Sequence, residues 1–268
     1  MGWRRVIQMM QLYRNWPVAL ADRAGFLPSG RLVTFHIRTT ETDVQLTGET
    51  AVEDVRVLNE MWLEDPYLRG FEGLPPDTTC VVDIGANRGY FASRIACAYP
   101  NARVFSYEPE PRNAAILRLN VSRNHLDDRI QVMEVAVTPT EDRTAQLALA
   151  PLPLNHTMLA TERQLAGARL ITVPAVGIVE ALGAVLKEEP KIDLLKLDVE
   201  GLEPALLRAI PEDVFPFLNR IAAEIDDPSE RDMSAEFLAA REFSISVTDG
   251  YLYAWQPGNV SSRSSVNS

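Results

Sequence analysis

The chain has 268 residues, of which 46% are hydrophobic and 24% charged, proportions that are typical of a globular protein with a substantial core. Its formal net charge of −11 disfavours a nucleic-acid partner, because phosphate contacts need clustered lysine and arginine. The two cysteines form no CxxC pair, so a structural zinc site is not expected, and both are interpreted as small buried side chains.

Residues 1–75 are predicted to form an extension of helices and a short β-hairpin that packs on a core domain. Residues 3–14 have helical spacing, and one side of this helix comprises Val6, Met9, Met10 and Tyr13. The favoured interpretation is a helix packed on the domain. The alternative is a helix that its paired arginines, at positions 4 and 5, hold to an anionic membrane surface.

The rest of the extension is predicted as two strands around a polar turn within residues 31–46, followed by a helix within residues 49–68. Polar residues interrupt any hydrophobic signal region near the start, and no stretch approaches the roughly 18 apolar residues of a membrane span. A cytoplasmic location is therefore expected.

The core domain, residues 76–257, alternates predicted strands with predicted helices. The strands are residues 79–83, 103–107, 130–135, 192–197, 220–225, 242–247 and 250–255. The helices are residues 90–98, 111–123, 177–187, 202–209 and 230–240. This alternation predicts an α/β fold with a mostly parallel sheet and helices on both faces, which a hairpin across Asp249-Gly250 completes. Residues 136–170 are assigned no regular structure, and the polar tail 258–268 is expected to be disordered.

A glycine-rich turn follows the first core strand in the pattern Asp83-x-Gly85-x-Asn87-x-Gly89. Parallel sheets bind ligands at the carboxyl ends of their strands, and glycines there let a ligand approach the backbone. A dinucleotide fingerprint needs G-x-G-x-x-G, and this chain places Asn87 and Tyr90 where the second and third glycines would stand. The spacing therefore excludes a pyrophosphate loop of that type.

Glu108 ends the second core strand, 19 residues after Gly89, and Pro109 stiffens the turn behind it. A carboxylate at this place can accept hydrogen bonds from both ribose hydroxyls. A ribose site without a pyrophosphate loop favours an adenosine cofactor such as S-adenosylmethionine. The alternative is that Glu108 only supplies negative charge to the start of the next helix.

Acidic residues follow two further strands. Asp198 and Glu200 come at the end of one strand, before a turn at Gly201, and Glu224 and Asp226 come at the end of the next. Two strand ends with paired acids predict a functional cleft, although a solvated turn would have the same composition.

Three segments together resemble the FkbM-family S-adenosylmethionine-dependent methyltransferases: "VVDIGANRGYFASRIA", "VFSYEPEPRNAAILRLNV" and "LLKLDVEGLEPALL". The resemblance implies a seven-stranded, Rossmann-like class I methyltransferase fold. It also implies methyl transfer to a hydroxyl oxygen of a sugar or other natural product. A carboxyl methyltransferase that forms a methyl ester, and a cofactor-binding homologue without catalysis, stay open as alternatives. Val179 stands where the family commonly has an aspartate, and "PLPLNHTML" replaces a Gly- and Ser-rich stretch, so the acceptor pocket is less defined than the cofactor site.

Site residues follow from the motifs and the resemblance together. The expected cofactor-binding set is Asp83, Gly85, Ala86, Asn87, Gly89, Tyr90, Phe91, Glu108, Pro109, Glu134, Ala136 and Asp198. The expected catalytic set is Asp198, Glu200, His156 and Lys196.

Each catalytic candidate has an alternative. Asp198 either touches the reacting groups or only shapes its turn, and Lys196 is either a base of lowered pKa or the partner of Asp198 or Glu224. Glu200 is expected to bind the acceptor or a divalent ion, although no metal ligands are assigned. His156 is either a general base or a surface imidazole in a loop that could cover the acceptor. A small-molecule or glycan acceptor is expected, and a homodimer is left open.

Overall fold

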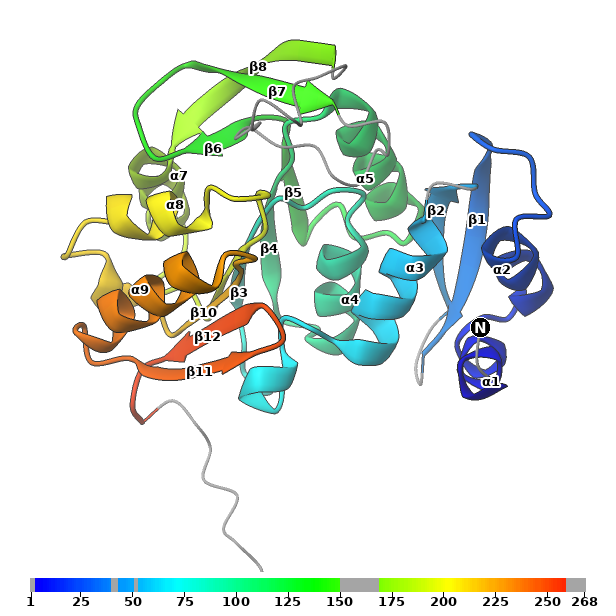
Figure 1. Cartoon of the computed structure of the whole chain (residues 1–268), viewed down its shortest axis with the longest axis horizontal. Coiled ribbons are helices and arrows are strands. Elements are labelled where there is room, and N and C mark those ends of the chain that lie inside the picture. The colour runs from blue at the N-terminus through cyan, green and yellow to red at the C-terminus, as the bar shows by residue number, and fades with distance from the viewer. Residues whose placement is uncertain (1–2, 40–42, 51–52, 150–168, 259–268) are drawn as a thin grey trace, which may run out of the picture.

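The computed structural model of the chain describes residues 3–39, 43–50, 53–149 and 169–258, and its centre is a seven-stranded sheet (Figure 1). The strands are β3 (Cys80–Ile84), β4 (Arg103–Tyr107), β5 (Ile130–Met133), β9 (Leu194–Leu197), β10 (Arg220–Glu224), β11 (Ser244–Thr248) and β12 (Tyr251–Trp255). Their order is β11-β12-β10-β9-β3-β4-β5, and β12 alone runs opposite to the other six strands. This arrangement confirms the predicted Rossmann-like sheet and its C-terminal hairpin.

Helices cover both faces of the sheet (Figure 1). The core helices are α4 (Tyr90–Ala98), α5 (Pro111–Arg123), α7 (Ile178–Leu186), α8 (Glu203–Ala209) and α9 (Pro228–Ala239). Successive strand residues point to opposite faces, so Val81 packs in the core with α4 and α5, while Val82 packs in the core with α7, α8 and α9. Burial on both faces explains why the inner strands are almost continuously apolar.

A second sheet occupies part of the section that the sequence left without regular structure. It consists of β6 (Ala136–Thr138), β7 (Thr144–Leu149) and β8 (Arg169–Gly177), in the order β6-β8-β7. β7 pairs antiparallel with β8, although 19 residues separate them in the chain, and this connection lies outside the described residues. No short turn marks the pair in the sequence, which explains why the pairing was not predicted.

The N-terminal part lies beside α4 and α5, except for its last turn, Arg69–Phe71, which lies against β11 and β12 (Figure 1). Its elements are α1 (Trp3–Leu12), α2 (Trp16–Arg23), β1 (Leu32–Arg38), β2 (Asp43–Glu49), α3 (Asp54–Asn59), the π-helix η1 (Glu60–Glu64) and the 3₁₀ turn η2 (Arg69–Phe71). The predicted hairpin is confirmed by β1 and β2. The predicted helix within residues 49–68 is confirmed over residues 54–64, but its second half, η1, is a π-helix, a form that is frequent at functional sites. None of the helices in the described ranges has the length and apolar character to cross a membrane.

The predicted apolar side of the first helix is only partly right. Met9 and Tyr13 are buried in α1 and directly after it, together with Leu12, which was not predicted. Met10, in contrast, is 38% exposed and lies on the opposite side. The helix therefore packs on the domain through one side and presents a second apolar side outward.

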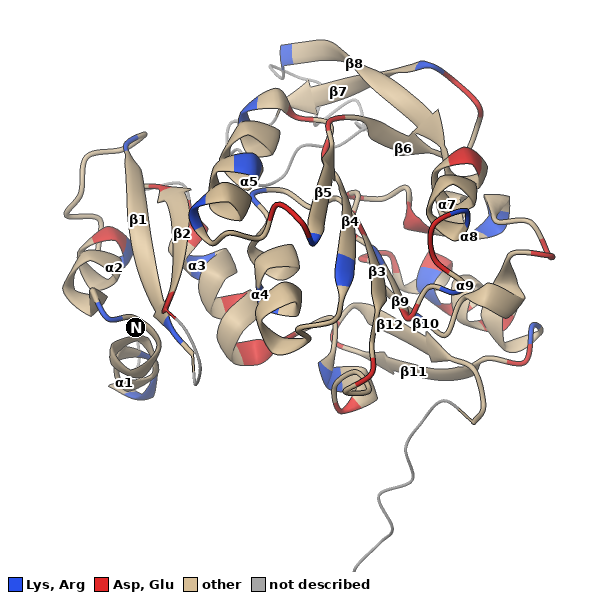
Figure 2. Ribbon diagram, turned by 180° about the vertical axis from the view of Figure 1, so that it is seen from behind, with Lys and Arg blue, Asp and Glu red and all other residues tan. Residues whose placement is uncertain are grey.

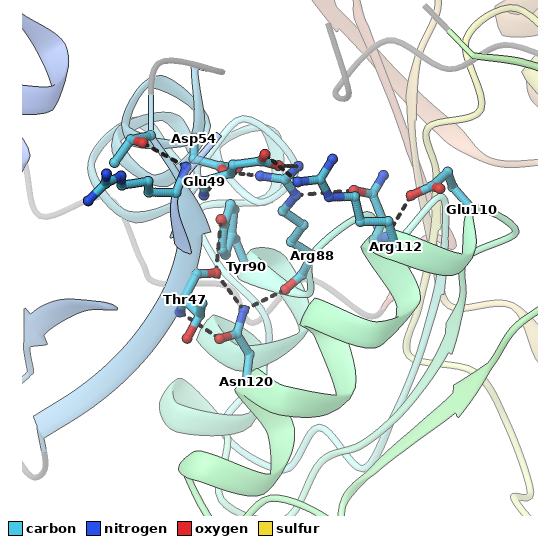
Figure 3. Close-up of polar contacts among 11 residues, drawn as sticks. Thr47, Glu49, Asp54, Arg88, Tyr90, Glu110, Arg112 and Asn120 are labelled. Carbon is cyan, nitrogen blue, oxygen red and sulfur yellow. Dashed lines mark hydrogen bonds and ion pairs between the residues drawn. The ribbon is translucent and has the colours of Figure 1, made fainter. Parts of the chain in front are cut away.

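A buried arginine joins the N-terminal part to the core domain (Figure 3). The guanidinium of Arg88 is fully buried, forms an ion pair with Asp54, and donates from Nη2 to Glu49 at 3.1 Å. Its Nε donates to Oδ1 of Asn113 in α5 at 3.1 Å. Arg88 belongs to the glycine-rich turn after β3, so this ion-pair cluster fixes the turn against the N-terminal part.

Asn120 of α5 strengthens the same junction (Figure 3). Its Oδ1 accepts from the backbone N–H of Thr47 in β2 at 2.6 Å, and its Nδ2 donates to the carbonyl of Arg88 at 2.9 Å. One side chain thereby satisfies backbone groups of both β2 and the turn. A buried amide that uses its donor and its acceptor in this way costs little to bury.

Candidate active site

A pocket of about 220 Å³ lies at the carboxyl ends of β3, β4, β9 and β10. Residues of the turn after β3 line it together with Glu108 and Pro109 after β4, and with the acids that follow β9 and β10. The opposite wall comes from the N-terminal part of the chain and comprises Arg56, Val57, Glu60, Met61 and Tyr67. The pocket lies where parallel sheets commonly bind their ligands.

Close packing and positive φ angles explain why two positions of the turn, Gly85 and Gly89, are glycines. Gly85 has φ +80°, and a Cβ there would lie 1.7 Å from the carbonyl oxygen of Asp198, so the ends of β3 and β9 touch. Gly89 has φ +75°, and a Cβ there would lie 2.0 Å from Cδ1 of Leu117 in α5. Both glycines are therefore required by packing within the protein, independently of any ligand.

Glu108 closes the turn from the end of β4. Its Oε2 accepts from the backbone N–H of Asn87 at 2.7 Å, and its Oε1 accepts from the backbone N–H of Glu110 at 2.9 Å. The carboxyl is 5% exposed, and burial raises its pKa to about 7 against the opposing effect of the two N–H donors. Each oxygen keeps a further lone pair, so Glu108 can hold the turn and still accept from a ligand in the pocket.

Lys196 of β9 lies beneath the pocket as a buried cation. Its Nζ donates to Oδ1 of Asp83 at 2.9 Å and to the carbonyl of Gly85 at 3.0 Å, and it lies 3.5 Å from Oδ2 of Asp198. Burial lowers the pKa of this amine, but Asp83 and then Asp198 outweigh burial, and the net direction is upward. These contacts favour the ion-pair interpretation of Lys196 over a base of lowered pKa, with Asp83 as a partner that the sequence did not indicate.

Tyr67 joins the two acidic strand ends, although it comes from the N-terminal part. Its hydroxyl lies 2.7 Å from Oδ2 of Asp198 and 2.9 Å from Oε2 of Glu224. The ring is buried, lies 4.7 Å from Nζ of Lys196, and meets Phe91 edge-on at a centroid distance of 5.5 Å. The ring and the hydroxyl of one side chain thus hold both a cation and two carboxylates in place.

The hydroxyl of Tyr67 has a single proton, so it donates to one carboxylate at a time. A close contact to the second carboxyl is stable when that carboxyl is protonated. Burial, followed by the charge of Asp198, raises the pKa of Glu224 to about 7, and burial and the same charge raise the pKa of Glu200 to about 8. Glu224 is therefore the carboxyl that shares the extra proton near neutral pH.

Most of the expected site residues meet at this pocket. Those that line it are Gly85, Ala86, Asn87, Tyr90, Phe91, Glu108, Pro109, Lys196, Asp198 and Glu200. Asp83 lies behind it as the partner of Lys196, and the hydroxyl of Tyr90 donates to the carbonyl of Thr47 at 3.2 Å.

The remaining expected residues lie elsewhere. Gly89 packs against Leu117, Glu134 forms a surface ion pair with Arg118 at 2.5 Å, and Ala136 is buried in β6, and none of the three lines the pocket. His156 lies outside the described residues. In the part of the chain that the structure describes, no three acidic, histidine or cysteine side chains gather in an arrangement suited to a metal ion.

Sequence reasoning missed the wall that the N-terminal part supplies. Tyr67, Glu60 and Met61 lie in or just after η1, and their segment had been interpreted as an ordinary amphipathic helix. The signal was weak, because no spacing rule links a tyrosine to acids that follow it by 131 and 157 residues.

Several known proteins with similar sequences are methyltransferases. The chain is 25% identical over 178 residues to methyltransferase sdnD of Sordaria araneosa, covering 58% of this chain and 69% of that one. It is 29% identical over 194 residues to the 31-O-demethyl-FK506 methyltransferase FkbM of Streptomyces tacrolimicus, covering 63% and 73%. A shorter match, 37% identical over 71 residues, covers 26% of this chain and 27% of the 2-O-methyltransferase NoeI of Sinorhizobium fredii.

The model of the methyltransferase FkbM domain matches residues 83–230, more than half of the chain. This range begins at the aspartate of the glycine-rich turn, includes the acids after β9 and β10, and ends in α9. It leaves out the N-terminal wall of the pocket. The chain belongs to the FkbM methyltransferase family.

Proposed function

We propose that this methyltransferase uses S-adenosylmethionine to methylate a hydroxyl oxygen of a small-molecule natural product or a glycan. The observation that carries the proposal is the arrangement of the pocket, in which a turn and Glu108 face the carboxylates of Asp198 and Glu224. The names of two relatives, which specify transfer to oxygen, support the same acceptor atom.

The residues at the turn fit the proposed cofactor. Oδ1 of Asn87 is buried and makes no hydrogen bond with the described residues, so it offers an acceptor to an amine or hydroxyl. Glu108 has lone pairs left for the ribose hydroxyls. When bound, S-adenosylmethionine would supply an electrophilic methyl group on a cationic sulfur.

Asp198 is the proposed general base. Tyr67 and Lys196 both approach Oδ2 of Asp198, so Oδ1 is the oxygen that their contacts leave for the acceptor. Asp198 would take the proton of the acceptor hydroxyl as the methyl group passes from the cationic sulfur to the acceptor oxygen, which would leave the sulfur as a neutral thioether. Lys196 and Tyr67 would orient the carboxylate, and correct alignment of oxygen and methyl would supply much of the rate acceleration.

The charges of the pocket favour a hydroxyl acceptor over a carboxylate. Five acids line the pocket around the proposed acceptor side: Glu60, Asp198, Glu200, Glu224 and Asp226. The two cations that line it are already paired, Arg56 with Glu53 and Glu60, and Lys196 with Asp83. A carboxylate acceptor would therefore meet repulsion, and the described residues that line the pocket offer no free cation to compensate for it.

The test uses purified protein, methyl-labelled S-adenosylmethionine, and small-molecule and glycan fractions of a cell extract. We expect label that survives mild base, as an ether does, whereas base-labile label would identify an ester and contradict the proposed acceptor. Asp198→Asn should bind S-adenosylhomocysteine within about tenfold of the native affinity, roughly 1.4 kcal/mol, and lose turnover. Native turnover in this variant would remove Asp198 from the chemistry.

A further inference from the structure

The outward side of α1 carries a stripe of exposed apolar side chains. Trp3 is 75% exposed, and Ile7 and Met10 are each 38% exposed. Spacings of four and three residues place the three on one face of the helix, opposite the face that buries Met9 and Leu12. The packed-helix and membrane-surface interpretations of this segment thus concern two different sides of the same helix.

The chain segregates its charge around this stripe. Residues 1–38 contain six arginines and one acidic residue, Asp22, and carry a formal charge of +5, whereas the whole chain carries −11. Arg4 and Arg23 are exposed, and Asp22 is buried. Figure 2 shows the basic positions on α1, α2 and β1, while the acidic positions concentrate on the rest of the molecule.

We propose that the face of α1 formed by Trp3, Ile7 and Met10 docks on an anionic lipid bilayer, with the arginines of residues 1–38 contacting the headgroups. A short helix with a tryptophan on its apolar side and arginine on its polar side lies well at a bilayer interface. Arg5 and Arg14 pair with Glu64 and Asp43, whereas Arg4 and Arg23 are exposed and form no ion pair with the described residues.

Charge complementarity selects this occupant over a neutral apolar surface. Anionic headgroups attract the +5 segment and repel the remaining −16 of the protein, so attraction and repulsion together orient the molecule with α1 toward the bilayer. Three side chains bury little apolar area, so binding should need anionic lipid and should weaken as salt rises.

The test is co-sedimentation of the full chain with vesicles of phosphatidylcholine alone or mixed with phosphatidylglycerol. We expect binding at least about tenfold stronger to the mixed vesicles. A Trp3→Ser/Ile7→Ser double variant and Arg4→Glu should each lose about tenfold. The matched controls, Phe217→Ser for an exposed apolar side chain and Lys187→Glu for an exposed cation, should bind like the native chain.

Brominated lipid gives a second readout. Because Trp3 is exposed in the free protein, we expect vesicles with brominated acyl chains to quench part of the native fluorescence and none of that part in Trp3→Phe. Equal binding to neutral and anionic vesicles, or no binding at all, would overturn the proposal. So would a concentration-dependent dimer that Trp3→Ser abolishes in a protein that binds neither kind of vesicle.

Discussion

The hydroxyl of Tyr67 donates toward Oδ2 of Asp198 across 2.7 Å, although 131 residues separate the two in the chain. Tyr67 precedes the range that the family model matches, and Asp198 lies within it. This contact thus makes the N-terminal part a direct partner of the proposed base.

Replacement of Tyr67 by phenylalanine keeps the ring on Lys196 and removes only the hydroxyl. We expect turnover to fall by about tenfold to a hundredfold, since Asp198 loses its orienting donor, while the affinity for S-adenosylhomocysteine stays unchanged. Kinetics with the labelled acceptor and calorimetry with the cofactor product measure the two effects. Tyr107→Phe removes another buried hydroxyl, which donates to the carbonyl of Ala181, and serves as the control. A loss of cofactor affinity in Tyr67→Phe alone would assign the residue to cofactor binding.

Glu108→Ala should weaken binding of S-adenosylhomocysteine by about a hundredfold or more, because the turn loses one acceptor and the ribose another. The matched control is Glu134→Ala, since Glu134 pairs with Arg118 on the surface and does not line the pocket. Calorimetry on both variants measures the difference. Equal affinities would contradict the ribose assignment.

Glu224 should make the protein less stable as the pH rises. Its pKa is raised from about 4.5 to about 7, so the folded state holds this proton more tightly than the unfolded state does. The resulting stabilisation is fully present below about pH 4.5 and is lost as the pH rises through about 7. Between pH 5 and 8, the Tm of Glu224→Gln should therefore decrease less than the Tm of the native chain does. Parallel pH profiles of the two proteins would contradict the shared proton at Tyr67.

Arg88→Met should lower the free energy of unfolding by about 3–5 kcal/mol, because Glu49 and Asp54 are left as buried acids without their cation. Arg118→Met breaks an exposed ion pair and should cost below about 1 kcal/mol. Denaturant unfolding measures both. A small effect at Arg88 would mean that the ion-pair cluster contributes little to joining the N-terminal part to the core.

Local patterns predicted much of the core domain. The helices α4 and α5 begin and end at the residues expected from spacing, and the hairpin of β11 and β12 turns at Asp249-Gly250, both of which have positive φ. The turn, Glu108 and the strand-end acids could be identified because each follows an apolar strand within a few residues. The contacts of Tyr67, the ion pair of Lys196 with Asp83, and the pairing of β7 with β8 join segments that are distant in the chain. No local period in the sequence encodes such contacts.

One wall of the pocket, at Arg56, Val57, Glu60, Met61 and Tyr67, precedes residue 83, where the family model begins. The range that the family model matches therefore includes the acids at positions 198, 200, 224 and 226 but not this wall. Exchanging this segment between family members, with the sheet left unchanged, would show directly whether the wall governs which acceptor the enzyme takes.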